Sequence, residues 1–429
     1  MKLIFENWRR FVSLHETTMQ EPIREPLDLP VPDDLIKIYE LMKQADKQLY
    51  IVGGAVRDTI LGKAPKDYDL ATDAKPEEVM SLLVPGFERD PTTSKVTQQG
   101  YKKKITGRRF PVVTTWTPES NYTNEYEIAT FRKDVGKGRR PEGFEFTTIE
   151  EDVKRRDLTI NALFYDIGTG QVVDYVGGLA DLKSGTIRAV GDPSERFSED
   201  PLRTLRTIRF AARMGSKIEP ETKEGILANN DLYADPDMSK EAVTEEFKKG
   251  IVTAKDPEYY IHLARELGLL SRIFPGLTVA PVKTKSRDLI VQLALLLREN
   301  GEKQAVKVLK DMRYSGDTIR AVRFLISLLG LTEMTALGLK KEFKKLQQSQ
   351  EGTSNQQWKV WPIGPSIREF ASAGGLASNE IEAFLQFAVN PVALSSEKAR
   401  AQGLVGAEMG RAMAAAEQQA YIALTGGSQ

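Results

Sequence analysis

Apolar positions in the first part of the chain switch between helical and strand-like spacing. From Asp33 to Gln44 they recur at the intervals of an amphipathic helix, and the run from Leu49 to Val52 that follows is apolar throughout. The same criteria predict a short helix that stops at Gly62, a helix over Lys75–Leu83, and strands over Asp67–Ala71, Pro111–Thr115 and Tyr126–Phe131. Residues 33–175 are therefore expected to form a mixed α/β unit with a small sheet.

Beyond Asp200 helical spacing dominates, interrupted by Gly and Pro. The predicted helices are Pro201–Met214, Asp256–Leu270, Arg287–Glu299, Lys303–Met312, Thr318–Leu329, Met334–Gln347, Ser366–Ser372, Asn379–Phe387 and Ser396–Ala423. The polar segment Gln347–Gln357 has no apolar period and is predicted to be an exposed loop or linker. The expected fold class is α+β, with the mixed unit first and an all-helical region after it.

A chain of 429 residues exceeds what one hydrophobic core usually serves, so several domains are expected. The pattern divides the chain into an N-terminal arm mixing aromatics, charges and prolines (1–32), the mixed unit (33–175), a first helical part (176–255) and a second helical part (256–429). No apolar run is long enough to span a membrane, and the N-terminus lacks the apolar centre of a signal peptide. These features predict a cytoplasmic protein without membrane contact.

Charge and composition narrow the chemistry. The chain has no cysteine, which excludes disulfides, thiolate metal sites and cysteine nucleophiles, and its two histidines, His15 and His262, are far apart in sequence. The 60 basic and 60 acidic residues cancel, so attraction to a polyanion must come from local clustering. One such cluster comprises Lys102, Lys103, Lys104, Arg108, Arg109, Arg132, Lys133, Lys137, Arg139 and Arg140. A solvated charged face is the alternative interpretation of this run.

The segment LYIVGGAVRDTILGKAPKDYDLAT (residues 49–72) contains the first candidate site. A strand that runs into Gly53-Gly54 before a helix lets backbone amides approach an anion, and Arg57 in the first helical turn can grip phosphate oxygens. Neither the dinucleotide-binding glycine pattern nor the P-loop pattern is present. A tight turn without a ligand is the alternative for the glycine pair.

Two aspartates, Asp67 and Asp69, follow within the next predicted strand. Residues i and i+2 of a strand point to the same face, so the two carboxylates converge and repel each other unless a cation lies between them. Mg²⁺ prefers oxygen ligands and commonly combines one or two carboxylates with substrate phosphates. Glu127, in the strand Tyr126–Phe131, is the best candidate for a third catalytic acid. A polar strand end for the aspartates and an exposed edge for Glu127 are the alternatives.

The same segment resembles the first motif of class II tRNA nucleotidyltransferases and bacterial poly(A) polymerases, within the polymerase-β-like nucleotidyltransferase superfamily. Three further blocks follow in the order of that family: RRDLTINALFYD (155–166), DYVGGLADLKSGTIRAVGDPSERF (174–197) and EDPLRTLRTIRFAARMG (199–215). The resemblance is dense from about residue 49 to 250. It implies a catalytic head, a neck with base-selecting helices, and a helical body and tail that bind RNA.

The family resemblance assigns roles to residues of the first two blocks. It implies that Asp67 and Asp69 bind the catalytic Mg²⁺ ions, and that Gly54 and Arg57, beside Gly53, hold the nucleotide triphosphate. Arg156 and Asp157 are expected next to the ribose. An aspartate can accept a hydrogen bond from a 2′-hydroxyl, so a site built around that bond disfavours deoxyribonucleotides.

The block that begins at Glu199 carries the expected base selection. Asp200 precedes Pro201 and fits a helix N-cap, while Arg203, Arg206 and Arg209 continue along one helical face. A carboxylate beside a guanidinium matches the amine and ring nitrogen of cytosine and adenine, and it faces a mismatched carbonyl in uracil and guanine. The resemblance to the family implies that Asp200 and Arg203 have this role. Arg206 and Arg209 are further expected nucleotide contacts.

Two departures from the family pattern bear on function. The next family motif usually contains Glu-Arg-Ile, whereas this chain has Glu241-Ala242-Val243, a change expected to affect neck rigidity more than chemistry. With His262 as the only histidine after residue 15, the histidine-aspartate phosphohydrolase activity of some relatives is excluded.

Two enzymatic functions fit the resemblance. The expected one is addition of CCA to tRNA 3′ ends from CTP and ATP with release of pyrophosphate, with the tRNA acceptor arm bound by the helical parts. Poly(A) polymerase, which adds AMP to RNA 3′ ends, is the alternative. The compact helical end of the chain, without a long basic tail, favours CCA addition. An inactive RNA-binding relative is the third interpretation.

Overall fold

A computed structural model describes residues 21–83, 87–89, 96–98, 100–107, 110–136, 143–235, 237–351 and 362–426. Two compact units are present. The first, here called the sheet unit, comprises Met1–Thr207 and Ser216–Asn229, and the second, the helical unit, comprises Ile208–Gly215 and Asn230–Gln429. The long helix α8 (Leu202–Met214) contributes its first part to the sheet unit and its second part to the helical unit.

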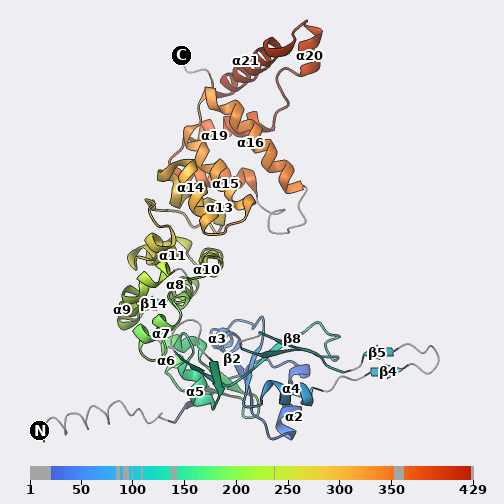
Figure 1. The fold of residues 1–429 in the computed structure, drawn as a ribbon, viewed down its shortest axis with the longest axis vertical. Helices are drawn as coiled ribbons and strands as arrows, with labels where there is room; N and C mark the ends of the chain where they lie inside the picture. Colours follow the sequence, from blue (N-terminus) through green and yellow to red (C-terminus); the bar gives the residue numbers. More distant parts are fainter. Residues whose placement is uncertain are drawn as a thin grey trace, which may run out of the picture. The chain divides into compact units, whose positions relative to one another are not determined.

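A mixed sheet of eight strands forms the centre of the sheet unit within the described residues (Figure 1). Its order is β1-β12-β11-β2-β3-β8-β7-β6, and the pair β3–β8 is parallel while its other described neighbours are antiparallel. The strands are β1 (Ile23–Pro26), β2 (Leu49–Val52), β3 (Asp69–Thr72), β6 (Lys102–Thr106), β7 (Val112–Trp116), β8 (Glu125–Thr130), β11 (Phe164–Asp166) and β12 (Gln171–Asp174).

Short helices and three small ladders complete the sheet unit. The helices are α2 (Asp33–Gln44), α3 (Gly54–Ile60), α4 (Pro76–Leu82), α5 (Ile149–Lys154), η1 (Thr159–Asn161), α6 (Gly178–Ser184), α7 (Pro193–Glu199) and α9 (Pro220–Asn229). The ladders pair β4 (Phe87–Arg89) with β5 (Val96–Gln98), β9 (Arg132–Val135) with β10 (Gly143–Phe146), and β13 (Thr186–Ile187) with β14 (Lys217–Ile218).

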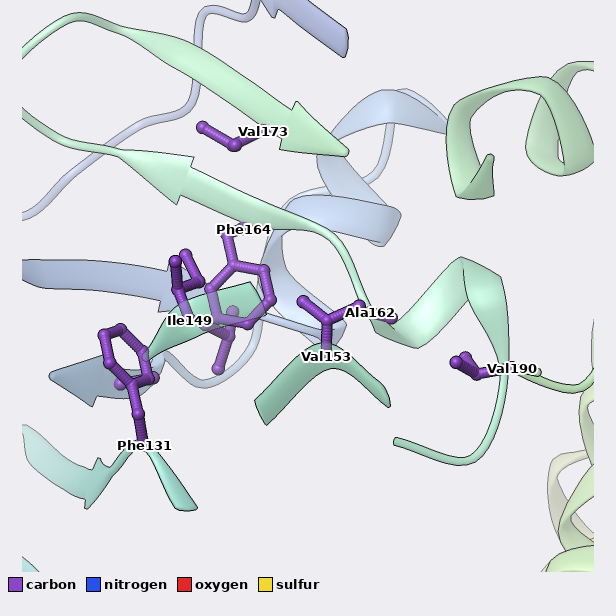
Figure 2. Close-up of a cluster of buried hydrophobic side chains, with 9 residues drawn as sticks. Phe131, Ile149, Val153, Ala162, Phe164, Val173 and Val190 are labelled. Carbon is purple, nitrogen blue, oxygen red and sulfur yellow. The ribbon is translucent and has the colours of Figure 1, made fainter. Parts of the chain in front are cut away.

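A cluster of buried apolar side chains lies where α5 meets the sheet. Phe131 and Phe164 lie with their ring centroids 6.3 Å apart in an edge-to-face arrangement, and Ile149 and Val153 of α5 pack against them (Figure 2). Ala71 of β3 belongs to the same cluster. Strand β3 therefore has one residue, Ala71, fixed in the core two positions after the exposed Asp69, so its alternating pattern determines which face Asp69 occupies.

Helix α2 holds strand β8 and the loop before it from the face of the sheet opposite to the acids. Its buried Asp34 accepts hydrogen bonds from Tyr126 Oη at 2.8 Å, Thr117 Oγ1 at 2.6 Å and Asn124 Nδ2 at 3.0 Å. These bonds together lower the pKa of Asp34 although burial alone would raise it. The buried Tyr126 therefore anchors β8 and leaves its neighbour Glu127 exposed on the other face.

The helical unit consists of packed helices and short 3₁₀ turns. They are η2 (Asn230–Ala234), α10 (Lys240–Thr253), α11 (Pro257–Glu266), α12 (Leu269–Ile273), α13 (Leu289–Leu297), η3 (Arg298–Asn300), α14 (Gly301–Asp311), α15 (Gly316–Ser327), η4 (Leu328–Gly330), α16 (Glu333–Glu351), α18 (Ile363–Gly374), α19 (Ser378–Val389), α20 (Ser396–Ala401) and α21 (Gly406–Thr425). Helix α13 is buried on nearly all sides, which explains its unbroken apolar sequence.

The α+β fold class is confirmed, with three differences in detail. The sheet is larger than expected because β1 pairs with β12, so residues 23–26, assigned to the arm, belong to the sheet. The small β13–β14 ladder lies within the range expected to be all-helical. Helix α16 continues to Glu351, so the start of the segment predicted as a loop is helical, and the rest of that segment lies outside the described residues.

The boundary between the two compact units falls within α8, near residue 207, with a return to the sheet unit at 216–229. The finer division of the chain at residues 32, 175 and 255 stays a prediction. Residues 1–20 of the arm and the basic residues Arg108, Arg109, Lys137, Arg139 and Arg140 lie outside the described residues. Within the described ranges, every helix is too short or too polar to span a bilayer.

Candidate active site

The glycine turn between β2 and α3 forms as predicted. Gly53 has φ +69°, a left-handed conformation that favours glycine, and its backbone N–H donates to Leu163 O at 3.1 Å. Arg57 lies in α3 with its side chain buried, and its guanidinium donates from Nη1 to Asn161 Oδ1 at 2.6 Å and from Nε to Asp58 Oδ1 at 2.9 Å. A Cβ placed on Gly54 would lie 3.9 Å from Arg57 Nη2, so this glycine adjoins the guanidinium.

Asp69 and Glu127 lie next to each other on one face of the sheet, and with the nearby Asp67 they are here called the acid face. Asp69 is the first residue of β3, and its partner in the parallel register with β8 is Glu127. Paired residues of adjacent strands project to the same face, so these two side chains are neighbours. Asp67 lies two residues before Asp69 and outside β3, so the prediction of one strand that carries both aspartates is wrong. The side chains of Asp67, Asp69 and Glu127 are all exposed.

The electrostatics of this acid face are those of crowded like charges. Partial desolvation of the Asp69 carboxylate raises its pKa, and the charges of Glu127 and Asp67 raise it further. The charge of Arg156 acts in the opposite direction. Across the described residues, none of the three carboxylates has a hydrogen-bond or ion-pair partner, and no three such groups are close enough to hold one metal ion. Oxygen donors of this kind fit Mg²⁺, and Asp67 and Asp69 remain the predicted ligands.

Arg156 and Arg155 are held by a buried carboxylate, Asp152. Arg156 donates to Asp152 Oδ2 from Nε and Nη2, at 3.2 and 3.0 Å, and its guanidinium carbon lies 4.5 Å from the centroid of the Phe164 ring. Arg155 donates to Asp152 Oδ1 at 2.9 Å. Burial alone would raise the pKa of Asp152, yet the charges of Arg156 and Arg155 lower it overall. This carboxylate therefore orients both arginines, and Arg156 is close enough to the acid face for its charge to act on Asp69.

Asp157 connects the expected ribose site to α8. Its Oδ2 accepts from Arg206 Nε at 2.7 Å, and its Oδ1 accepts from Leu158 N at 2.8 Å and from Asn161 Nδ2 at 3.3 Å. Asn161 in turn accepts from Arg57, so one continuous set of hydrogen bonds joins Arg206, Asp157, Asn161 and Arg57. The arrangement brings the expected ribose-binding and triphosphate-binding residues into one network.

Asp200 and Arg203 line a cavity of about 330 Å³ in the sheet unit. The other residues that line it are Phe110, Arg132, Lys133, Asp134, Gly136, Glu151, Lys154, Arg155, Arg196 and Glu199. Asp200 Oδ1 accepts from Leu202 N at 3.2 Å, as a helix cap does, and α8 begins one residue later than predicted. The cavity is within the usual size range of small-ligand sites.

The guanidinium of Arg203 is already oriented by the protein. Nη1 donates to Arg196 O at 2.9 Å and to Glu199 Oε2 at 2.6 Å, while Nη2 donates to Arg155 O at 3.1 Å. Glu199 also accepts from Arg196 Nη1 at 2.7 Å. The planar group is therefore fixed in one orientation before any ligand arrives.

Arg209 is not brought into this cluster. It belongs to the helical unit, is buried, and pairs with Glu246 of α10. Among the expected nucleotide contacts on α8, only Arg206 lies with Asp200 and Arg203 in the sheet unit. Arg209 as a nucleotide contact remains a prediction to which the described contacts add no support.

Sequence reasoning missed several supporting residues. Asp152, Asn161 and Glu199 orient the arginines, and none was singled out from the sequence. Asn161 lies in the quoted block RRDLTINALFYD, and Glu199 immediately precedes Asp200, so proximity to the motifs was the available signal. Asp152 carries no such signal, because its role depends on burial that only the fold reveals.

Comparisons with known proteins identify the family to which the chain belongs. Residues 49–188 match the model of the poly A polymerase head domain. The chain is 33% identical over 296 residues to poly(A) polymerase I of Escherichia coli O6:H1, covering 63% of this chain and 58% of that enzyme. It is 33% identical over 319 residues to the CCA-adding enzyme of Lactobacillus helveticus, covering 70% of this chain and 73% of that enzyme. The match thus spans little more than half the length of the first of these relatives.

A solved structure extends the likeness of fold along the chain. The structure of the Thermotoga maritima CCA-adding enzyme complexed with tRNA superposes with a TM-score of 0.62 at 19% sequence identity, covering 96% of this chain and 97% of that chain. At this identity the likeness concerns the fold alone. Together with the extent of the Lactobacillus helveticus match, the conclusion is that this chain belongs to the nucleotidyltransferase family that contains the bacterial CCA-adding enzymes and poly(A) polymerase I.

Proposed function

We propose that this protein is an enzyme that adds CCA to tRNA 3′ ends, using CTP and ATP without a nucleic-acid template and releasing pyrophosphate. The observation that carries the proposal is the parallel register that pairs Asp69 with Glu127, with Asp67 two residues earlier, on a face that adjoins Arg156. Carboxylates without a protein partner can bind a divalent metal, and oriented arginines beside them can bind the triphosphate.

The metal is proposed to be Mg²⁺, held by Asp67 and Asp69. When bound, Mg²⁺ lowers the pKa of the RNA 3′-hydroxyl and stabilises the charge of the leaving pyrophosphate. Glu127, next to Asp69 in the register, is positioned to accept the proton of that hydroxyl or to complete the ligand set. The turn at Gly53 and Gly54, with Arg57, is proposed to face the triphosphate.

Selection of the nucleotide is proposed to depend on residues that the protein orients in advance. Asp157, fixed by Arg206 and Asn161, would accept a hydrogen bond from the ribose 2′-hydroxyl. Asp200 and Arg203 would present an acceptor and donors to the base in their cavity, which suits cytosine and adenine. Because Arg203 is bound by two backbone carbonyls and Glu199, its guanidinium can present its remaining N–H groups without reorganisation.

Addition of CCA is preferred to addition of poly(A) on one ground. Fold similarity to a CCA-adding enzyme extends over nearly the whole of both chains, whereas the sequence matches cover relatives of the two kinds to similar extents. Poly(A) addition remains the second candidate because the chain is 33% identical to poly(A) polymerase I over 296 residues and residues 49–188 match the poly A polymerase head domain. The proposed location is the cytoplasm, where tRNA is processed in bacteria.

The deciding experiment supplies the purified protein with a tRNA that lacks its last three nucleotides. CTP alone, ATP alone and both together are compared by gel analysis of the product lengths. Ordered addition that stops after three nucleotides supports CCA addition. Long tails made from ATP alone would overturn it in favour of poly(A) polymerase. The variant Asp200→Ala is expected to relax the choice among the four nucleotides while tRNA affinity is retained.

A further inference from the structure

Two exposed lysines on the edge strand β6 have no role in the chemistry proposed above. Lys102 and Lys104 are exposed, and their ammonium groups lie over aromatic rings, with Lys102 Nζ 4.0 Å from the Tyr122 centroid and Lys104 Nζ 5.0 Å from the Trp116 centroid. In the described part of the chain neither lysine has a carboxylate partner. We call Lys102, Lys104, Trp116 and Tyr122 the lysine strip.

The register of the sheet places this strip on the face that carries the acids. Lys104 is paired with Thr114 of β7, Thr114 with Glu127 of β8, and Glu127 with Asp69 of β3. Residues paired in this way project to the same side of the sheet. Strand β6 is three strand spacings from β3, which carries Asp69, roughly 14 Å. Lys104 thus lies on the same surface as the proposed metal site, three strands away from it.

Lys103 provides an internal contrast on the same strand. It alternates to the opposite face, where its ammonium group donates to Met80 O at the end of α4. Its role is thereby structural. Lys102 and Lys104, in contrast, hold their charges at the open surface, with the aromatic rings supporting the side chains.

The order of strands indicates on which side of Asp69 the leaving pyrophosphate and the attacking RNA would lie. On the other side of Asp69, the register partner is Val52, the last residue of β2, which leads into the Gly53–Arg57 turn proposed to face the triphosphate. In nucleotidyl transfer the attacking and leaving oxygens are roughly in line on opposite sides of the phosphorus. If pyrophosphate leaves on the β2 side, the RNA 3′-hydroxyl must approach from the side of β8, β7 and β6.

We infer that the lysine strip binds the RNA strand next to its 3′ end. Lys102 and Lys104 neutralise phosphates of the last nucleotides, and the Trp116 ring offers a face on which a base can stack. This inference rests on the proposed function, because it uses the position of the leaving pyrophosphate to define the direction of attack. It adds an RNA contact on the sheet unit to the contacts expected from the helical parts.

The test is a double variant, Lys102→Ala with Lys104→Ala, assayed on the tRNA lacking its last three nucleotides. The KM for this tRNA is expected to rise on the order of tenfold at physiological salt, with the KM for CTP and the kcat at saturating tRNA unchanged. The slope of log affinity against log salt concentration, measured by fluorescence anisotropy of the labelled tRNA, is expected to fall by about 1 to 2.

The matched control removes two lysines from the α2 side of the sheet. Lys37→Ala with Lys47→Ala makes the same change in net charge. It serves as a control because these lysines pair with Glu119 and Glu78 instead of facing the acids. This control is expected to leave the KM for tRNA and the salt slope unchanged. Trp116→Ala tests the stacking contact separately and is expected to raise the KM for tRNA, while Trp116→Phe retains most of the effect of the ring.

The outcomes separate this inference from the proposed function. If the wild-type protein adds no nucleotide, the proposed function has failed. If the wild type adds nucleotides but the lysine double variant keeps the wild-type KM for tRNA and salt slope, the lysine strip does not bind RNA. A rise in the KM for CTP without a rise in that for tRNA also overturns the inference, because the strip would then contact the incoming nucleotide.

Discussion

The acid face and the neighbouring arginine cluster, formed by Arg155, Arg156 and Arg206 with Asp152 and Asp157, differ in how their charges interact. On the acid face, Asp67, Asp69 and Glu127 are exposed and without partners among the described residues, and mutual repulsion raises the pKa of Asp69 further than burial does alone. In the arginine cluster, Asp152 is buried and Asp157 is half-buried, both accept hydrogen bonds, and opposite charges lower the pKa of each although burial would raise it. One region is destabilised by its own charges, and the other is stabilised by them.

This difference indicates how the work of the site is divided. The groups proposed to recognise ribose and base are fixed before the nucleotide binds, so little reorganisation is needed for selection. The groups proposed to hold the metal gain favourable interactions only when a cation arrives, so binding energy is concentrated at the reacting phosphate. Variants that remove a charge should therefore have opposite effects on the stability of the two regions.

The largest effect is expected for Asp69→Ala. Loss of a metal ligand removes several kcal/mol of transition-state stabilisation, so the rate of CMP incorporation should fall on the order of 10³-fold or more. The melting temperature, measured without added metal, should stay at or above that of the wild type, because a repelled charge is removed. A fall in activity accompanied by a lower melting temperature would show instead that Asp69 is needed for folding.

Asp152→Ala should produce the opposite result, a loss of stability. The change leaves Arg155 and Arg156 without their common buried partner, and breaking buried ion pairs costs about 3–5 kcal/mol. Urea unfolding followed by circular dichroism gives this free energy. The control is Lys154→Ala, which removes an exposed pair with Glu151 and should cost less than about 1 kcal/mol. Equal losses for the two variants would contradict the distinction between the regions.

Asp157→Asn tests whether the arginine cluster selects the sugar. The amide keeps the shape of the side chain but weakens its hold on Arg206, and it loses an anionic acceptor for the 2′-hydroxyl. The ratio of kcat/KM for CTP to that for dCTP should fall about tenfold or more. Activities with CTP and dCTP that fall by the same factor would indicate that Asp157 supports the fold of the site without contacting the ribose.

The elements of the acid face could be predicted because the relevant information is local. The helix Asp33–Gln44 and the strand Leu49–Val52 form with the predicted bounds, since their apolar spacing is regular. Alternation along β3 was enough to orient Asp69 relative to the core. The pairing of Asp69 with Glu127 was less accessible, because a parallel register between distant strands depends on the whole sheet.

The arginine cluster could be predicted only in part, because its partners are distant in sequence. Arg57 and Asn161 are 104 positions apart, and Arg203 donates to a backbone carbonyl 48 positions away. Backbone acceptors leave no signature in the side-chain pattern. Arg206 and Arg209 have the same residue type and the same helical spacing, yet one pairs with Asp157 in the sheet unit and the other with Glu246 in the helical unit.

The smallest effect is expected for Asp69→Asn, whose stability relative to the wild type should change with pH. The folded-state pKa of Asp69 is raised above its value of 3.8 in the unfolded chain, so the folded protein binds the proton more tightly. Stability is therefore lost as the pH rises from about 4 through the folded-state pKa, and is constant above it. The melting temperature of the amide variant should equal that of the wild type at low pH and be slightly higher at neutral pH.

Magnesium provides a second comparison of the same two proteins. It should stabilise the wild type by mass action and the variant much less, reversing the order of the two melting temperatures at neutral pH. Melting curves from about pH 3.5 to 7.5, with and without MgCl₂, measure both changes, and a wild type that is the more stable protein at neutral pH without metal would show that the acid face is not under electrostatic repulsion.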